Sequence, residues 1–300
     1  MGLATGDALG VPGEFQPRGS YPKITEMIGG GPFHLNPGEW TDDTSMALCL
    51  GKSLIDKNKF DPDDIMEKFW SWVENGYMSS NGRMFDIGDT TSEALCHYKK
   101  YKHAYAGMIT SSDNKKSGNG SIMRLAPIPM FFKDPADHVS YISYATLSSE
   151  LTHGSLNCKC ACCYLSTLIV GALNGVSKEE LLGPYYFPIS DRRPILEPEV
   201  LDVAMGVYKT KTIDDIKSTG YVIHTLESAL WCFYTTNTFE EGCIKAVNLG
   251  EDTDTVGAVY CQLAGAYYGI ASIPQRWLDK VVLKDIIIDV ADKLYQKRKI

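Results

Sequence analysis

Residues 40–55, with the sequence WTDDTSMALCLGKSLI, decide the fold class of this chain. Five apolar residues of this stretch carry the pattern, Met46, Cys49, Leu50, Leu54 and Ile55. They stand at positions i, i+3, i+4, i+8 and i+9, as on one face of an α-helix. We therefore predict a helix that begins near Met46, with a polar and acidic segment directly before it.

The same periodicity runs through most of the chain, first at Ile65, Phe69, Trp72 and Val73. Further predicted helices cover residues 92–100, 139–151, 157–174, 199–208, 223–234, 239–249, 256–270 and 281–297. Alternating β-branched runs are scarce, so strands are not expected. The predicted fold is a single all-α domain over residues 1–300.

The predicted helices are separated by four long segments rich in Gly, Pro, Ser or Asn, at 11–40, 76–92, 107–124 and 184–198. Long loops in a compact helical domain are usually functional or disordered. We therefore look for the site in these loops and in the helix starts that follow them.

The composition limits the class of partner. The formal net charge is −8, which argues against nucleic acid as the main ligand but leaves room for a small phosphorylated one. The first ten residues lack the basic and apolar regions of a signal peptide, and the apolar run at 164–173 is too short to span a bilayer. The nine cysteines are typical of a reduced, cytoplasmic protein. We expect it to act away from membranes, and one large, self-contained domain favours a monomer.

One cysteine cluster allows two interpretations. Cys160 and Cys163 have the C-x-x-C spacing of a thiolate metal site. Cys158 and Cys162, however, lie one helical turn apart in an apolar segment, and no second Cys or His pair completes four ligands. We interpret the cluster as core packing.

Two acidic motifs carry the strongest chemical signal. Thr41, Asp42 and Asp43 precede the first predicted helix, and Asp252, Asp254 and Thr255 precede the helix at 256–270. A single Asp before a helix is an ordinary N-cap, whereas two carboxylates with a hydroxyl exceed what capping requires. Asp252 and Asp254 are two residues apart, so their side chains lie on the same side of the chain and face one centre if that segment is extended.

Together the two motifs predict a binuclear metal site. Converging carboxylates repel one another unless cations neutralise them, and two-metal enzymes hold such cations about 3.5–4 Å apart. Oxygen ligands without a His or Cys cluster favour two Mg²⁺ or Mn²⁺ ions over zinc.

Several further residues are candidates for the site. Residues 116–124, KSGNGSIMR, form a glycine-rich loop whose N–H groups can bind an anion, although it is neither a P-loop nor a dinucleotide fingerprint. Asp7 and Glu14 stand in an apolar stretch expected to be buried, and buried carboxylates need partners. Asp86 lies between Phe85 and Ile87 and is not explained as a helix cap. His153 fits either a core histidine or a phosphate or ribose contact, and Tyr221 fits either the core or stacking on a base.

These motifs resemble those of the ADP-ribosylglycohydrolases. The resemblance is carried by GLATGDALG at 2–10, PGEW-TDDT at 37–44, GNGSIMR at 118–124, Thr152-His153 and GEDTDTVGA at 250–258, and it extends to about residue 278. It implies a compact orthogonal helical bundle with a binuclear metal cleft, and a hydrolase that releases ADP-ribose from a modified acceptor.

The resemblance also implies individual roles. The implied metal ligands are Thr41, Asp42, Asp43, Asp252, Asp254 and Thr255. Glu14 matches a catalytic or metal-gating glutamate, Asp86 matches a carboxylate at the substrate ribose, and either of them or a metal-binding carboxylate such as Asp254 would be the general base. The implied substrate-binding residues are Lys116, Ser117, Gly118, Asn119, Gly120, Ser121 and Ile122 around the diphosphate, with His153 nearby and Tyr221 near the adenosine.

Three functions fit the sequence. The first is metal-dependent cleavage of ADP-ribose from a protein or small conjugate, with arginine favoured over serine, other side chains, bases and acyl esters because the microbial members are the more similar. The second is a two-metal nucleotide phosphohydrolase, because acidic clusters also serve phosphoryl transfer. The third is a non-catalytic ADP-ribose-binding or structural protein, against which the complete set of carboxylates argues.

Overall fold

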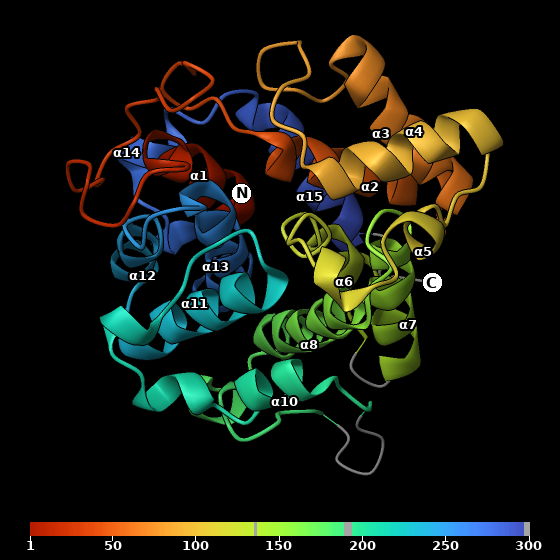
Figure 1. Ribbon diagram of the computed structural model, residues 1–300. Coiled ribbons are helices and arrows are strands. Elements are labelled where there is room, and N and C mark those ends of the chain that lie inside the picture. The colour runs from red at the N-terminus through yellow and green to blue at the C-terminus, as the bar shows by residue number, and fades with distance from the viewer. Residues whose placement is uncertain (135–136, 189–193, 297–300) are drawn as a thin grey trace.

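The computed structural model describes residues 1–134, 137–188 and 194–296, which form α-helices joined by loops and short 3₁₀ turns (Figure 1). Within these ranges no strand forms, and three isolated β-bridges are present. The prediction of an all-α fold is confirmed. The α-helices are α1 (Gly2–Gly10), α2 (Asp42–Lys57), α3 (Pro62–Asn75), α4 (Asp89–Tyr101), α5 (Gly107–Thr110), α6 (Pro127–Phe131), α7 (His138–Glu150), α8 (Leu156–Leu173), α9 (Lys178–Leu181), α10 (Pro198–Ala204), α11 (Val222–Thr235), α12 (Phe239–Ala246), α13 (Thr253–Tyr268), α14 (Gln275–Leu278) and α15 (Lys284–Gln296).

Helix α13 lies at the centre of the fold. It packs against α1, α8, α11 and α12, and its first twelve residues are all buried. Helix α8 is buried on almost every side as well. A helix that is apolar all round belongs in a protein interior, which explains why neither sequence shows a polar face. Around this centre, Figure 1 shows α2, α3 and α4 on one side and α7 and α8 on another, with α7 crossing α8 steeply.

Helix α1 lies against α13 at backbone contact, although about 250 residues separate them (Figure 1). The contact depends on glycines at every fourth position of α1, Gly2, Gly6 and Gly10. A Cβ on Gly6 would lie 2.2 Å from the carbonyl oxygen of Gly257, and one on Gly10 would lie 2.4 Å from the Cα of Asp254. Only glycine allows this approach, which places the end of α1 directly against the acidic start of α13.

The long loop between α1 and α2 is attached to the C-terminal part of the chain. The indole N–H of Trp40 donates to the carbonyl of Val282 at 3.0 Å, and that of Trp277 donates to Thr25 at 3.2 Å. Both indole rings are fully buried. Because a buried indole N–H needs an acceptor, these bonds hold the loop that carries Glu14 in one place.

Several helix starts and ends differ from the sequence prediction, and among them α15 begins at Lys284 rather than at 281. Helix α2 begins at Asp42 rather than near Met46, and α13 begins at Thr253 rather than at 256. The acidic residues therefore lie in and beside first helical turns, and Asp252 and Asp254 both line one cavity although the segment between them is helical rather than extended. Acidic side chains suit a first turn because they face the positive end of the helix dipole. Helix α4 likewise begins at Asp89, and α12 ends at Ala246.

Two predicted segments are divided differently. The predicted helix 199–208 ends at Ala204, because Gly206 takes a φ of 86° and the chain continues as a 3₁₀ turn, Val207–Thr210. The predicted loop 107–124 contains α5 and the 3₁₀ turn Asn114–Lys116. Residues 189–193 of the predicted loop 184–198 and residue 297 of the last predicted helix lie outside the described residues.

Helix α8 includes the apolar run at 164–173 and matches the predicted helix 157–174 within one residue. With 18 residues it is long and apolar enough to cross a membrane, but 78% of it is buried inside the structure. Its cysteines pack against the glycine-rich loop: the Sγ of Cys158 lies 3.1 Å from the carbonyl oxygen of Gly118, and that of Cys162 lies 3.4 Å from the Oγ of Ser121.

Because α1 and α13 are in backbone contact, one methyl group added between them should destabilise the fold. Gly6→Ala places a Cβ on the carbonyl of Gly257, so we expect the free energy of unfolding to fall by about 1–3 kcal/mol. Chemical denaturation measures this loss. Gly265→Ala in the same interface is the control, because its Cβ would meet its nearest atom at 3.3 Å and should cost less. Equal losses in the two variants would contradict the close-contact explanation.

Candidate active site

The carboxylate of Asp7 caps helix α2 from a neighbouring helix. Its Oδ1 accepts hydrogen bonds from the backbone N–H of Thr41 at 2.9 Å and from the Thr41 hydroxyl at 3.0 Å. Its Oδ2 accepts from the backbone N–H of Thr44 at 3.0 Å and from the Thr44 hydroxyl at 2.5 Å. No side chain of α2 itself caps this helix. The first turn of α2, with Asp42 and Asp43, is therefore oriented by a residue of α1.

The two acidic motifs meet at this point. The hydroxyl of Thr41 lies 3.3 Å from the Oδ2 atoms of both Asp43 and Asp254. The hydroxyl of Thr255 lies 3.3 Å from the same Oδ2 of Asp43. All four side chains are buried. The structure thus brings the start of α2 and the start of α13 together, as the sequence predicted.

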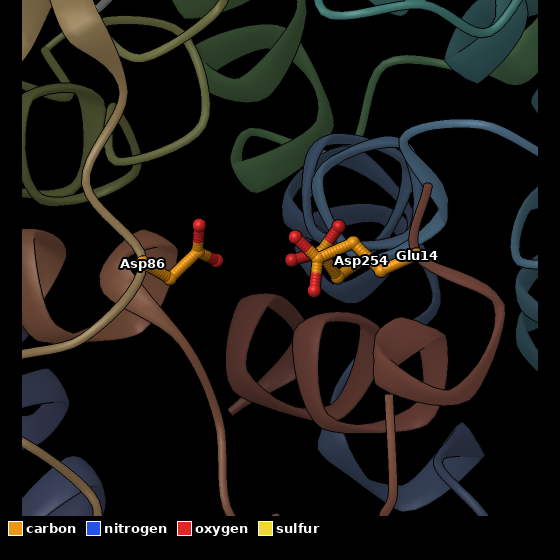
Figure 2. A group of neighbouring side chains, drawn as sticks. All are labelled: Glu14, Asp86 and Asp254. Atoms are coloured by element: carbon orange, nitrogen blue, oxygen red, sulfur yellow. The ribbon is translucent and has the colours of Figure 1, made fainter. Parts of the chain in front are cut away.

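Two further carboxylates arrive from loops. Figure 2 shows Asp86 extending from its loop toward Glu14 and Asp254, and oxygens of these three side chains lie within 4.8 Å of one another. Asp86 has a φ of 52°, a left-handed conformation that is uncommon outside glycine. Glu14 is held by the next two residues, since Phe15 donates to the carbonyl of Glu251 at 2.6 Å and Glu251 donates to that of Gln16 at 2.7 Å.

These groups border a cavity of about 240 Å³. Six acidic residues line it, of which Glu14, Asp42, Asp86, Asp252 and Asp254 are called the acidic wall below, and Asp89 is the sixth. The remaining lining residues are Phe15, Gly88, Thr90, Thr91, Gly118, Asn119, Gly120, Met123, His153, Gly220 and Thr255. The cavity therefore joins a strongly acidic wall to a wall of glycines, hydroxyls and one imidazole.

The glycine-rich loop is hydrogen-bonded to the residues just before α11 and α13. The backbone N–H of Asn119 donates to the carbonyl of Gly220 at 3.0 Å, and its side-chain amide donates to Asp252 Oδ2 at 2.8 Å. Gly118 pairs with Tyr221 in an isolated bridge. Gly118, Asn119 and Gly120 consequently face the cavity beside His153.

Five residues predicted to bind substrate do not line this cavity. Lys116 is exposed and forms an ion pair with Glu93 at 2.8 Å. The side chains of Ser117, Ser121 and Ile122 are buried behind the loop, where Ser117 bonds to Ser155 and Ser121 to Ser149. The hydroxyl of Tyr221 donates to Glu199 at 2.6 Å, outside the cavity. In an irregular loop, successive side chains point in different directions, so a sequence match over 116–122 cannot select the three that face inward.

Burial raises the pKa of every carboxyl group in the acidic wall. The pKa of Glu14 rises to about 9, first because of burial and then because of Asp86 and Asp252. The pKa of Asp86 rises to about 7 for the same kind of reason, and those of Asp43 and Asp254 lie well above the usual value. Ionised carboxylates crowded at low dielectric destabilise one another, so this wall needs an opposing charge.

The residues fit a divalent cation. Among the described residues, three buried carboxylate oxygens in or directly behind this wall lack a hydrogen-bond partner, Oε2 of Glu14, Oδ1 of Asp43 and Oδ1 of Asp254. Buried polar atoms are normally satisfied, and hard cations such as Mg²⁺ and Mn²⁺ bind oxygens of this kind. A buried acidic group with open oxygen atoms is a donor set suited to such an ion.

Comparison with known proteins agrees with this geometry. The family description of the ADP-ribosylglycohydrolases matches residues 1–299. The chain belongs to this family. The resemblance seen in the sequence motifs is thereby confirmed, and the protein is an ADP-ribosylglycohydrolase.

Relatives of this glycohydrolase cover nearly its whole length. It is 40% identical over 295 residues to the ADP-ribosylarginine hydrolase Tri1 of Serratia proteamaculans, with 98% of this chain and 77% of that protein covered. It is 31% identical over 289 residues to the ADP-ribosyl-[dinitrogen reductase] glycohydrolase of Rhodospirillum rubrum, covering 95% and 89%. A solved structure, an ADP-ribosylglycohydrolase-related protein complex, superposes with a TM-score of 0.84 at 40% identity and covers 99% of this chain and 95% of its own.

The sequence interpretation missed several lining residues of this glycohydrolase. Thr90 and Thr91 line the cavity at the start of α4, together with Asp89. Their Asp-Thr-Thr pattern at a helix start repeats the pattern of the other two acidic motifs and was an available signal. Gly220 and Phe15 also line the cavity, and nothing in their local sequence indicates this.

The raised pKa values predict how the metal-free glycohydrolase responds to pH. A carboxyl group whose pKa is higher in the folded state stabilises the fold below its unfolded pKa and loses this contribution as pH rises through the folded value. Asp7, Asp86 and Glu14 have folded values of about 6, 7 and 9. We therefore expect the melting temperature of the metal-free protein to fall as pH rises from about 5 to about 9.

Added Mg²⁺ or Mn²⁺ should remove most of this fall, since a cation at one hundred times its Kd stabilises the folded state by about 2.7 kcal/mol. Differential scanning calorimetry in EDTA and in each metal measures both effects. A melting temperature that is independent of pH in EDTA, or unchanged by either metal, would contradict this account of the acidic wall.

Proposed function

We propose that this glycohydrolase cleaves the N-glycosidic bond between ADP-ribose and an arginine side chain of a protein, with two divalent cations. The observation that carries the proposal is one cavity lined by buried carboxylates together with glycines and a histidine. The names of the relatives support the acceptor, because two of them are an ADP-ribosylarginine hydrolase and an ADP-ribosyl-[dinitrogen reductase] glycohydrolase.

The cations would be Mg²⁺ or Mn²⁺, held by oxygens of the two helix starts. The donors we assign to them are Thr41, Asp42, Asp43, Asp252, Asp254 and Thr255. When bound, such ions act as Lewis acids and lower the pKa of a coordinated water. Thr41 and Asp43 are buried behind the cavity lining, next to Asp254, so they would hold an ion from the protein side.

The shape of the cavity suggests how the substrate lies. Its volume of about 240 Å³ is below the ~300–1,000 Å³ typical of drug-sized ligands, so it suits the terminal ribose and the phosphates. The ribose would lie at the acidic wall and the diphosphate at Gly118, Asn119, Gly120 and His153. The adenosine would extend beyond the cavity toward Gly220 and Tyr221.

We assign proton transfer to Asp86. It reaches the reaction site from a loop of its own, and its carboxylate forms none of the hydrogen bonds that join Thr41, Asp43 and Asp254 (Figure 2). Asp86 accepts a proton from the attacking water as the water oxygen bonds to the anomeric carbon. The bond from that carbon to the guanidine nitrogen breaks, and its electron pair goes to nitrogen. Asp86 then returns the proton, because a guanidine is a far stronger base than a carboxylate.

Charge and exposure at the cavity edge also favour arginine. The ring of Phe15 lines the cavity and is 68% exposed, directly after Glu14. A guanidinium group stacks on aromatic rings and is attracted to carboxylates. A serine-linked or acetyl-linked acceptor would use neither feature.

The decisive assay is release of free ADP-ribose from arginine-, serine- and O-acetyl-linked substrates, in Mg²⁺, Mn²⁺ or EDTA. We expect metal-dependent release of intact ADP-ribose from the arginine conjugate and loss of activity in EDTA. Release of AMP or free phosphate would instead show phosphoester chemistry. Binding of ADP-ribose without turnover of any conjugate would show a binding protein, and release from another conjugate alone would overturn the arginine assignment.

Two variants separate metal binding from proton transfer. Asp86→Asn should lower kcat by about 10²–10⁴, the usual contribution of a general base, while calorimetric metal affinity stays close to wild type. Asp254→Asn should abolish turnover and weaken metal binding, yet the metal-free variant should melt above the metal-free wild type because one repelling charge is removed. Glu93→Gln, which alters an exposed carboxylate outside the cavity, is the control. Full activity of Asp254→Asn would contradict the two-metal proposal.

A further inference from the structure

A buried arginine stands behind the glycine-rich loop. The side chain of Arg124 is fully buried, and its guanidinium packs over the ring of Phe69 with 4.8 Å to the ring centre. Its Nη1 donates to the carbonyl of Gly120 at 2.8 Å, and its Nη2 donates to the hydroxyl oxygen of Thr152 at 2.6 Å. Arg124 thus contacts the cavity wall on two sides without reaching the cavity itself.

The hydroxyl of Thr152 connects Arg124 to His153. Its oxygen lies 2.6 Å from Arg124 Nη2 and 2.8 Å from the Nδ1 of His153. A guanidinium can only donate hydrogen bonds, so the oxygen accepts from Arg124 and the hydroxyl hydrogen remains free to donate. Thr152 is fully buried, and a buried hydroxyl hydrogen without an acceptor is costly. The hydrogen therefore points to Nδ1 of His153, which must be the unprotonated ring nitrogen.

The proton of the neutral imidazole then lies on Nε2, on the cavity side of the ring. His153 lines the cavity, and its Nε2 lies against the glycine-rich loop, 3.4 Å and 3.1 Å from the positions that a Cβ would take on Gly118 and Gly120. A Cβ on Gly120 would also lie 2.8 Å from Cε1 of the ring, so glycine is required there for the ring to fit. Burial, and then the charge of Arg124, lowers the pKa of His153 to about 3, which keeps the ring neutral at any ordinary pH.

We propose that Arg124 and Thr152 are positioning residues that hold His153 in the Nε2–H tautomer, so that this N–H donates to a phosphate oxygen of the substrate beside Gly118 and Gly120. This inference rests on the proposed function for the identity of the ligand, but the tautomer itself does not depend on it. The same guanidinium also binds the Gly120 carbonyl, so this acceptor is occupied and does not oppose an anion beside the imidazole.

The tautomer is measured first, on the ligand-free wild-type protein. Long-range ¹H–¹⁵N spectra of protein labelled at histidine distinguish a protonated from an unprotonated ring nitrogen, and His153→Gln assigns the signals among the six histidines. We expect a protonated Nε2 and an unprotonated Nδ1 for His153, unchanged from pH 5 to pH 8. A proton on Nδ1, or titration within this range, would overturn the proposal without any variant.

The hydrogen-bond relay from Arg124 through Thr152 to His153 is tested with two variants. Thr152→Val keeps the shape of the side chain and removes its hydroxyl, whereas Thr152→Ser keeps a hydroxyl. In Thr152→Val we expect a mixture of tautomers and binding of ADP-ribose about tenfold to hundredfold weaker by calorimetry, the loss of one hydrogen bond to a charged group. Thr152→Ser should keep both the wild-type tautomer and the wild-type affinity. Equal behaviour of the two variants, or an altered tautomer with unchanged affinity, would overturn the positioning role.

The two proposals fail separately. If the wild type binds no ADP-ribose but shows the Nε2–H tautomer, and Thr152→Val alone disturbs it, the relay stands and the proposed ligand is wrong. If the wild type hydrolyses the arginine conjugate while His153 carries its proton on Nδ1, the function stands and the relay is wrong.

Discussion

The carboxylate of Asp7 is the constraint on which the site depends. A fully buried carboxylate is stable only when hydrogen bonds replace its water, and Asp7 finds four of them at the first turn of α2. The same contacts that satisfy Asp7 orient Thr41 and the two aspartates behind it. Because α1 lies on α13 through its glycines, the bond from Asp7 also determines how the start of α2 faces the start of α13. The hydrogen bonds that replace water around Asp7 therefore also determine where the other carboxylates of the site lie.

This arrangement places charges of one sign close together in the interior. Thr41 stands between Asp43 and Asp254, and Glu14 and Asp86 complete the group from two loops. Interior packing alone offers no reason to collect acidic groups with raised pKa values and unpartnered oxygens. The arrangement is that of a protein whose folded state is adapted to a bound cation. The wall of glycines and His153 differs in charge, since Arg124 lies buried behind it while only neutral groups of this wall line the cavity.

Much of the fold was predictable because helical periodicity is a local property. The stripes around Phe69 and along 157–174 and 223–234 correspond to α3, α8 and α11 within a few residues. The starts of α2 and α13 were placed three or four residues late, because acidic N-terminal turns look like loops when only apolar residues are counted. The break after Ala204 was missed because it depends on the left-handed backbone of Gly206.

The sequence by itself determined the chemical groups of the site: the Thr-Asp-Asp and Asp-Thr-Asp-Thr motifs, Glu14, Asp86, the glycine-rich loop and the family that their combination indicates. Residue type and short spacing are local, and they suffice to name a donor set. Only the tertiary structure decided which members meet and which way they face. Lys116, Ser121 and Tyr221 turn away from the cavity, whereas Thr91 and Gly220 turn into it. Likewise, Arg124 and Thr152 orient His153 only because segments from three parts of the chain are packed together, and such long-range packing leaves no local pattern in the sequence.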